Sequence, residues 1–216
     1  MKGAVLLLSY PILYRNPPVA EAAQISAPKI SPKAVIGVDS MIIGDITIAD
    51  DVFIGFKNLL RADSGYPYYV GPYTNIQDYV LMHVHPGREH VNVKGRKWGV
   101  YLEGENSVLH HAAVHGPLFV GRNTFIGQHA NIYDAIIGRN CVIMHGATVT
   151  NGVKIPDNRF VAPGETVWQQ EQADRLPPVP DKWKDLNRKI VDHYYRLGKS
   201  YLHHTPLAFS YGAHRY

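Results

Sequence analysis

The chain has 216 residues, of which 45% are hydrophobic and 19% are charged. These proportions are typical of a globular protein and exclude the disordered and coiled-coil classes, and the length favours one domain with a terminal extension. The 22 basic and 18 acidic residues are scattered and give a net charge of +4, so we expect no nucleic-acid partner.

Residues 1–29 are interpreted as an N-terminal extension. The segment opens with Lys2 and an apolar run that imitates a secretory signal, but Pro11, Pro17 and Pro18 interrupt it. A run of about 18 apolar residues, the length that a membrane-spanning helix needs, is found nowhere in the chain. We therefore expect a cytoplasmic protein with no membrane partner.

Residues 30–170 carry a repeat in which an aliphatic residue returns every six positions. The series is Ile36, Ile42, Ile48, Ile54, Leu60, Val70, Ile76, Met82, Leu102, Val108, Val114, Val120, Ile126 and Ile132, followed after a slip of one residue by Ile137, Ile143, Val149, Ile155 and Val161. This period fits neither an amphipathic helix nor an isolated strand, but it fits an all-β solenoid whose stacked coils bury one aliphatic residue per step. A β-sandwich of short strands is the alternative. The single cysteine, Cys141, falls within this apolar repeat and is predicted to be structural.

The remaining segments depart from the repeat. Residues 85–101 lack the step and contain Pro86, Gly87 and Gly95, so we expect them to leave the coil as a loop or hairpin. Residues 171–180 are rich in proline and charge and are interpreted as a linker. Residues 181–204 form a predicted helix capped by Asp181, and residues 205–216 form a tail. An apolar stripe should pack the helix along the solenoid; it consists of Trp183, Leu186, Ile190, Tyr194, Leu197 and Tyr201.

Three of the 12 histidines stand out by their place in the repeat. His83 and His115 each follow an inward aliphatic residue directly, whereas His110 lies two places after Val108. Equivalent slots stack on neighbouring coils, so His83 and His115 can line up if the intervening loop bulges outward, and His110 then belongs to another face. Two imidazoles from one chain and a third from an adjacent chain would leave a coordination position open for water or substrate. The alternative is that each histidine is an ordinary surface residue.

Polar residues interrupt the apolar ladder upstream of these histidines. They are Arg61, Asp63, Asn75, Gln77 and Asp78, and two of them, Arg61 and Gln77, occupy the same repeat slot as His83. A metal-bound water needs donors and acceptors that orient it, and histidine ligands need partners that fix their tautomer, so these residues could supply both. An ordinary Arg–Asp pair and an Asn-capped corner are the structural alternative.

Four segments together resemble the gamma-class carbonic anhydrases: Arg-Ala-Asp at 61–63, Thr-Asn-Ile-Gln-Asp at 74–78, Val-Leu-Met-His at 80–83 and His-His-Ala-Ala-Val-His-Gly-Pro at 110–117. The resemblance covers roughly residues 30–201. It implies a left-handed parallel β-helix with a C-terminal helix packed along it, assembled as a homotrimer. It also implies a zinc ion, with iron or cobalt as alternatives, held by His83 and His115 of one chain and His110 of the next.

The same resemblance implies the reversible hydration of carbon dioxide to bicarbonate by a metal-bound hydroxide at the trimer interface. Arg61 and Asp63 would bridge subunits, Gln77 would hydrogen-bond the metal-bound solvent, and Asn75 and Asp78 would support them.

Proton export is the point at which the sequence departs from the archaeal members of that family. Ser64 stands where those enzymes have a glutamate, and the loop after the first ligand histidine is shorter and less acidic. Because histidine titrates near neutrality, a histidine is the favoured substitute. The candidates for the proton shuttle are Glu89, His85, His90 and His111.

Three other functions stay open at this point. Hexapeptide acyltransferases share the solenoid and use a histidine base, and some gamma-type relatives hydrolyse thioesters. A scaffold or bicarbonate-binding subunit is the non-enzymatic alternative. Ser64 keeps that alternative open, whereas the complete set of three histidines favours chemistry.

Overall fold

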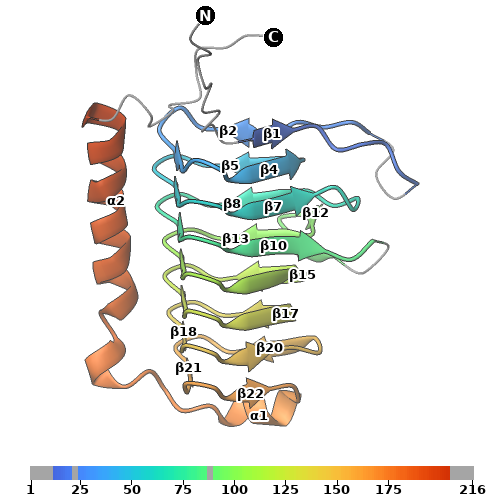
Figure 1. The fold of residues 1–216 in the computed structure, drawn as a ribbon. Helices are drawn as coiled ribbons and strands as arrows, with labels where there is room; N and C mark the ends of the chain where they lie inside the picture. The colour runs from blue at the N-terminus through green and yellow to red at the C-terminus, as the bar shows by residue number, and fades with distance from the viewer. Residues whose placement is uncertain (1–11, 21–23, 87–89, 205–216) are drawn as a thin grey trace, which may run out of the picture.

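The computed structural model describes residues 12–20, 24–86 and 90–204. It is a left-handed parallel β-helix, as predicted, with a helix alongside it (Figure 1). Ile36 pairs with Ile54, three repeat steps further along the chain, so three steps complete one coil. Each coil therefore contributes one short strand to each of three faces.

The strands of the first two faces form one continuous sheet, and those of the third face form another. The first face contains β1 (Ile12–Tyr14), β4 (Met41–Gly44), β7 (Leu59–Ala62), β10 (Leu81–Val84), the first parts of β15 (Ala113–Val120) and β17 (Asn131–Ile137), β19 (Thr148–Val149) and β22 (Thr166–Val167). The second face contains β2 (Lys29–Ile30), β5 (Ile46–Ile48), β8 (Tyr68–Val70), β13 (Val100–Leu102), the last parts of β15 and β17, and β20 (Val153–Ile155). The third face contains β3 (Val35–Ile36), β6 (Phe53–Ile54), β9 (Asn75–Ile76), β14 (Ser107–Val108), β16 (Phe125–Ile126), β18 (Val142–Ile143) and β21 (Phe160–Val161).

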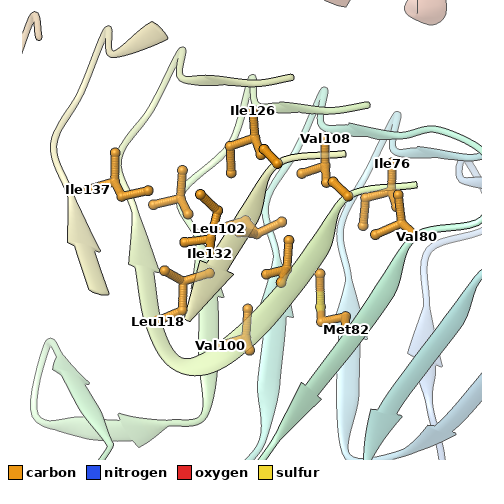
Figure 2. Close-up of a cluster of buried hydrophobic side chains, with 14 of the residues drawn as sticks. Ile76, Val80, Met82, Val100, Leu102, Val108, Leu118, Ile126, Ile132 and Ile137 are labelled. Atoms are coloured by element: carbon orange, nitrogen blue, oxygen red, sulfur yellow. The ribbon is translucent and has the colours of Figure 1, made fainter. Parts of the chain in front are cut away.

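The core runs through the middle of the coils. Every aliphatic residue of the predicted series is buried, and Ile36, at 3% exposed, is the least buried of them. Figure 2 shows side chains such as Ile76, Met82 and Val108 converging on the shared interior from successive coils. Burial of each such side chain contributes about 1.5–3 kcal/mol, so the column of stacked aliphatic residues is the main stabilising feature of the fold.

Cys141 belongs to this core and gives a direct test of it. The residue is 0% exposed, and burial raises the pKa of its thiol to about 11. Because the thiolate is the reactive form, the folded protein should not react with an aromatic disulfide reagent at mildly alkaline pH. Unfolding in guanidinium should release one reactive thiol, which the absorbance of the cleaved reagent measures. Rapid labelling before unfolding would contradict this placement, and Cys141→Ser provides the blank.

Three segment boundaries differ from those expected. Strand β1, inside the expected N-terminal extension, pairs in parallel with β4 and so adds a strand to the first face. The excursion expected over 85–101 contains an antiparallel hairpin, β11 (Val91–Val93) and β12 (Arg96–Trp98), and it ends before Val100, whose side chain is fully buried between coils. The linker expected over 171–180 contains most of a short helix, α1 (Gln170–Arg175).

The C-terminal helix α2 (Leu186–His204) lies along the third face (Figure 1). A 3-10 turn, η1 (Asp181–Trp183), precedes it, so the helix expected from Asp181 begins later than predicted. Its apolar side packs as expected: the ring of Tyr194 lies 5.0 Å from that of Phe53, and Leu186 joins a second apolar cluster against the third face. None of the described helices has both the length and the apolarity to cross a membrane. Within the described residues, the helix covers the third face, and Trp98 of the β12 hairpin strand packs on Tyr69 and Tyr101 of the second face.

Candidate metal centre

Two histidines lie side by side on the outside of the first face. His83 on β10 and His115 on β15 are direct register partners, and their ring centroids are 5.5 Å apart. The segment that joins the two coils leaves the solenoid as a hairpin, which lets the two slots stack. The predicted alignment of His83 with His115 is therefore confirmed.

His83 faces a carboxylate and a hydroxyl. Its Nε2 lies 3.4 Å from Oδ1 of Asp63 and 3.2 Å from Oγ of Ser64. Burial, and then the nearby Arg61 cation, lowers the pKa of His83 below its ordinary value. The imidazole is therefore neutral near neutral pH, which is the form that binds a metal.

Arg61 and Asp63 bond to each other within the chain. Nε and Nη2 of Arg61 donate to Oδ2 of Asp63 over 3.0 and 2.8 Å. Both donors bind one oxygen, so they anchor Oδ2 while Oδ1 faces His83. The pair therefore holds the carboxylate beside His83 within one chain, and the bridge between subunits that the family resemblance implied stays a prediction.

Ser64, His83 and Asp63 do not form a catalytic triad, although all three are in contact. In a catalytic triad, the carboxylate binds one ring nitrogen of the histidine and the nucleophile binds the other. Here Ser64 Oγ and Asp63 Oδ1 both approach Nε2 of His83. The arrangement does not activate the serine for acyl chemistry.

The surroundings of His115 define its tautomer. Its Nδ1 lies 3.0 Å from the carbonyl oxygen of Gly116, and a carbonyl can only accept, so Nδ1 carries the hydrogen. The lone pair then resides on Nε2, the nitrogen that can bind a metal. The ring of Tyr133 stacks on that of His115, with centroids 4.6 Å apart and planes inclined by 25°.

His110 lies at another corner of the coil, where the third face leads to the first. Its Nδ1 is 3.3 Å from Oδ2 of Asp78 and 3.2 Å from the main-chain nitrogen of the same residue. The main-chain amide donates to a bare Nδ1, whereas the carboxylate can accept only from an Nδ1 that carries the hydrogen. Only the second arrangement leaves the lone pair on Nε2, so it is the one that suits a metal. Oδ1 of Asp78 accepts from the main-chain nitrogen of Phe56 over 2.8 Å, which holds the carboxylate in place.

Gln77 and Asn75 belong to this corner as well. Nε2 of Gln77 donates to Oδ1 of Asn75 over 3.2 Å, and Nδ2 of Asn75 donates to Oγ of Ser107 over 2.8 Å. Both side chains are buried. The repeat slot that Gln77 shares with His83 does not bring the two together, because consecutive steps lie on different faces.

The chain thus carries two separate groups of polar side chains, which are candidate half-sites. The two-histidine half-site consists of His83, His115, Arg61 and Asp63, and the one-histidine half-site consists of His110, Asp78, Asn75 and Gln77. In the described part of one chain, no three His, Cys, Asp or Glu side chains are grouped as a metal ion would require.

The proton-shuttle candidates are dispersed. The ring of His85 is exposed and lies 4.7 Å from that of His115, so it is the candidate that borders the two-histidine half-site. His90 packs on Tyr66, and His111 stacks on Tyr79 at the corner of the one-histidine half-site. Glu89 lies outside the described residues.

Comparison with known proteins identifies the family. No family model matches the chain. The carbonic anhydrase of Methanosarcina thermophila is 36% identical over 197 residues, which cover 86% of this chain and 79% of that protein. Gamma carbonic anhydrase 1 of Arabidopsis thaliana mitochondria is 30% identical over 81% of this chain and 59% of its own length. This chain belongs to the gamma-class carbonic anhydrase family.

Other relatives of this gamma-class chain have different names. The carboxysome assembly protein CcmM of a Nostoc species is 33% identical over 86% of this chain, which spans only 33% of that protein. A solved structure of a putative acetyltransferase from Bacillus cereus superposes with a TM-score of 0.71 at 24% identity, covering 89% of this chain and 98% of that one. The structural match shows a shared β-helix and no more.

Proposed function

We propose that this chain is a metal-dependent carbonic anhydrase that works as a homotrimer. The observation that carries the proposal is the division of the site: His83 and His115 are paired on the first face, and His110 lies at another corner. A head-to-tail contact that repeats around a threefold axis would bring each half-site against the other half-site of a neighbour.

The donor set fits a divalent cation. His83 and His115 of one protomer and His110 of the next would hold it, and three imidazoles suit zinc, with iron or cobalt as alternatives. When bound in such a site, the ion would lower the pKa of a water molecule to about 7 and so would supply hydroxide for attack on carbon dioxide.

The other polar residues would orient and support these groups. The amide of Gln77, held by Asn75, can hydrogen-bond solvent or bicarbonate that enters from its corner. The carboxylate of Asp78 lies 3.3 Å from Nδ1 of His110 and would accept a hydrogen from it when Nε2 binds the ion. Asp63, held by Arg61, lies next to His83 and can accept a proton from solvent. The reaction joins carbon dioxide and water to give bicarbonate and a proton, and the proton leaves by way of buffer or a surface group.

Exposed apolar side chains between the two half-sites support the contact between protomers. Tyr79 and Leu81 are 49% and 43% exposed. Tyr79 comes directly after Asp78, and Leu81 begins β10, the strand that carries His83. Large apolar residues exposed together often mark a protein–protein interface.

Stopped-flow hydration of carbon dioxide, on anaerobically purified protein of measured metal content, tests the proposal. Turnover should rise in proportion to the bound metal. A trimer with full metal occupancy and no turnover would contradict the enzymatic assignment, and a trimer that binds no metal would contradict the site itself.

A non-catalytic assembly role is the second candidate. Ser64 favours it, because a hydroxyl lies against His83 where the archaeal members of the family carry a glutamate. The inactive, fully metallated trimer described above is the result that would favour this role.

A further inference from the structure

We infer that Tyr133 is a positioning residue for His115 and holds its imidazole in the plane that metal binding requires. The inference rests on the proposed function, because that function makes His115 a ligand. It assigns a task to a residue outside both half-sites.

The backbone places Tyr133 for this task. Strand β17 pairs in parallel with β15, and Tyr133 is the register partner of His115 on the next coil. Both side chains therefore point outward from the first face, one above the other. The two rings are 4.6 Å apart between centroids, and their planes are inclined by 25°. This is an offset stack between side chains that stand on rigid, hydrogen-bonded strands.

Two of the contacts of His115 restrain the orientation of its ring directly. The carbonyl of Gly116 binds the Nδ1 edge over 3.0 Å, and Tyr133 covers one flat face. A hydrogen bond at one edge alone leaves the ring able to swing about that edge. The stack removes this freedom, so Nε2 keeps one direction.

His85 does not replace Tyr133 in this task. Its ring lies 4.7 Å from that of His115, but the planes are inclined by 51° and the side chain is exposed. The ring of His83 meets that of His115 edge-on, at 80°. Among the aromatic neighbours of His115 in the described part of the chain, Tyr133 is thus the one whose plane follows the plane of the imidazole.

The consequence concerns metal affinity. A ligand ring that is ordered before the metal arrives loses little rotational freedom on binding, and this preorganisation strengthens binding. The stack needs a ring and not a hydroxyl. Tyr133→Phe should therefore keep the affinity for zinc, whereas Tyr133→Leu should weaken it about tenfold, the upper end of what an aromatic pair contributes.

Competition with a zinc chelator measures this difference in dissociation constant. Phe119→Leu is the matched control: Phe119 lies on β15 itself, points outward on the second face and stacks on Tyr101 with centroids 5.8 Å apart. It should lose an equivalent stack without any change in zinc affinity. The far-ultraviolet circular dichroism and the molar mass of each variant establish that it folds and assembles like the parent protein.

The metal-free protein supplies a second measurement. The order parameter of the His115 ring, measured by ¹³C relaxation of its carbon–hydrogen bonds, should be high in the parent chain and in Tyr133→Phe and lower in Tyr133→Leu. Equal zinc affinity and equal ring order in Tyr133→Leu would overturn the inference while leaving the proposed function intact. A parent protein that binds no zinc would overturn the proposed function, and the ligand-positioning role would fall with it.

Discussion

Replacing His110 by alanine should abolish both metal binding and carbon dioxide hydration, although His110 lies apart from the paired His83 and His115 in its own chain. The reason is that the third imidazole of each site would come from a neighbouring protomer. Loss of an outer partner of a ligand costs about 10–100-fold in metal affinity or activity, so loss of the ligand itself should cost more than about a hundredfold. Metal analysis and stopped-flow assays of purified His110→Ala measure both effects.

His145→Ala is the control for that variant. His145 occupies the same corner two coils further along, and its Nδ1 accepts from the main-chain nitrogen of Gln128 over 2.9 Å. It is an exposed histidine like those on the surface of any protein, and its removal should leave turnover and metal content unchanged. A normal rate in His110→Ala, or an equal loss in His145→Ala, would contradict the assignment of His110.

Leu81→Arg should convert the trimer into monomers. Leu81 lies on the outer side of β10, two residues before His83, and is 43% exposed in the single chain. If a neighbour covers this position, the variant buries an unpaired charge at every interface. Such a charge costs about 3–5 kcal/mol, or more than about a hundredfold in the association constant. Light scattering during size-exclusion chromatography should give the 24.2 kDa mass of one chain for the variant and three times that mass for the parent protein.

Ile136→Arg places the same charge on a comparable apolar residue elsewhere. Ile136 is 37% exposed and points outward from the second face. The variant should remain trimeric and keep its turnover, because no half-site borders that position. Dissociation caused by Ile136→Arg, with a trimer intact in Leu81→Arg, would place the interface on the second face and contradict the shared site.

The six-residue repeat was sufficient to predict the inward column of the fold. A coil that turns the aliphatic residue of every step inward buries all of these residues at once. Ile54 and Val108 are buried in this way. The repeat also predicted that His83 and His115 align, because their slots are equivalent once the hairpin is set aside. The repeat did not show where the hairpin ends, because a valine at position 100 suits a hairpin strand as well as the next core strand.

The face on which a polar residue lies was harder to predict. The position directly after an inward aliphatic residue recurs on every face of the coil. That position alone therefore grouped Gln77 with His83. The structure instead places Gln77 at the corner of Asn75 and Asp78. The full coil, not the single step, decides which side chains meet. The same rule would have revealed Tyr133, which follows Ile132 in the slot of His115 one coil later.

The fold by itself does not decide the chemistry, because β-helices of this kind also occur in proteins named as acetyltransferases. Two features of the site favour the proposed metal-dependent chemistry: the tautomer of His115 and the division of the histidines. The Gly116 carbonyl gives His115 a lone pair on Nε2, and Asp78 lies against Nδ1 of His110 through both its carboxylate and its main-chain nitrogen. A coenzyme A-dependent acyl transfer requires neither arrangement.

The most direct test of a site shared between protomers is complementation in mixed trimers. His83→Ala lacks one half-site and His110→Ala lacks the other, so each should be inactive alone. When equal amounts are unfolded and refolded together, about a quarter of the interfaces should join an intact two-histidine half-site to an intact one-histidine half-site, as random assembly of a cyclic trimer requires. We predict recovery of about a quarter of the parent activity and zinc content. Mixed trimers that form, as tagged subunits would reveal, but stay inactive and free of zinc would contradict the shared site.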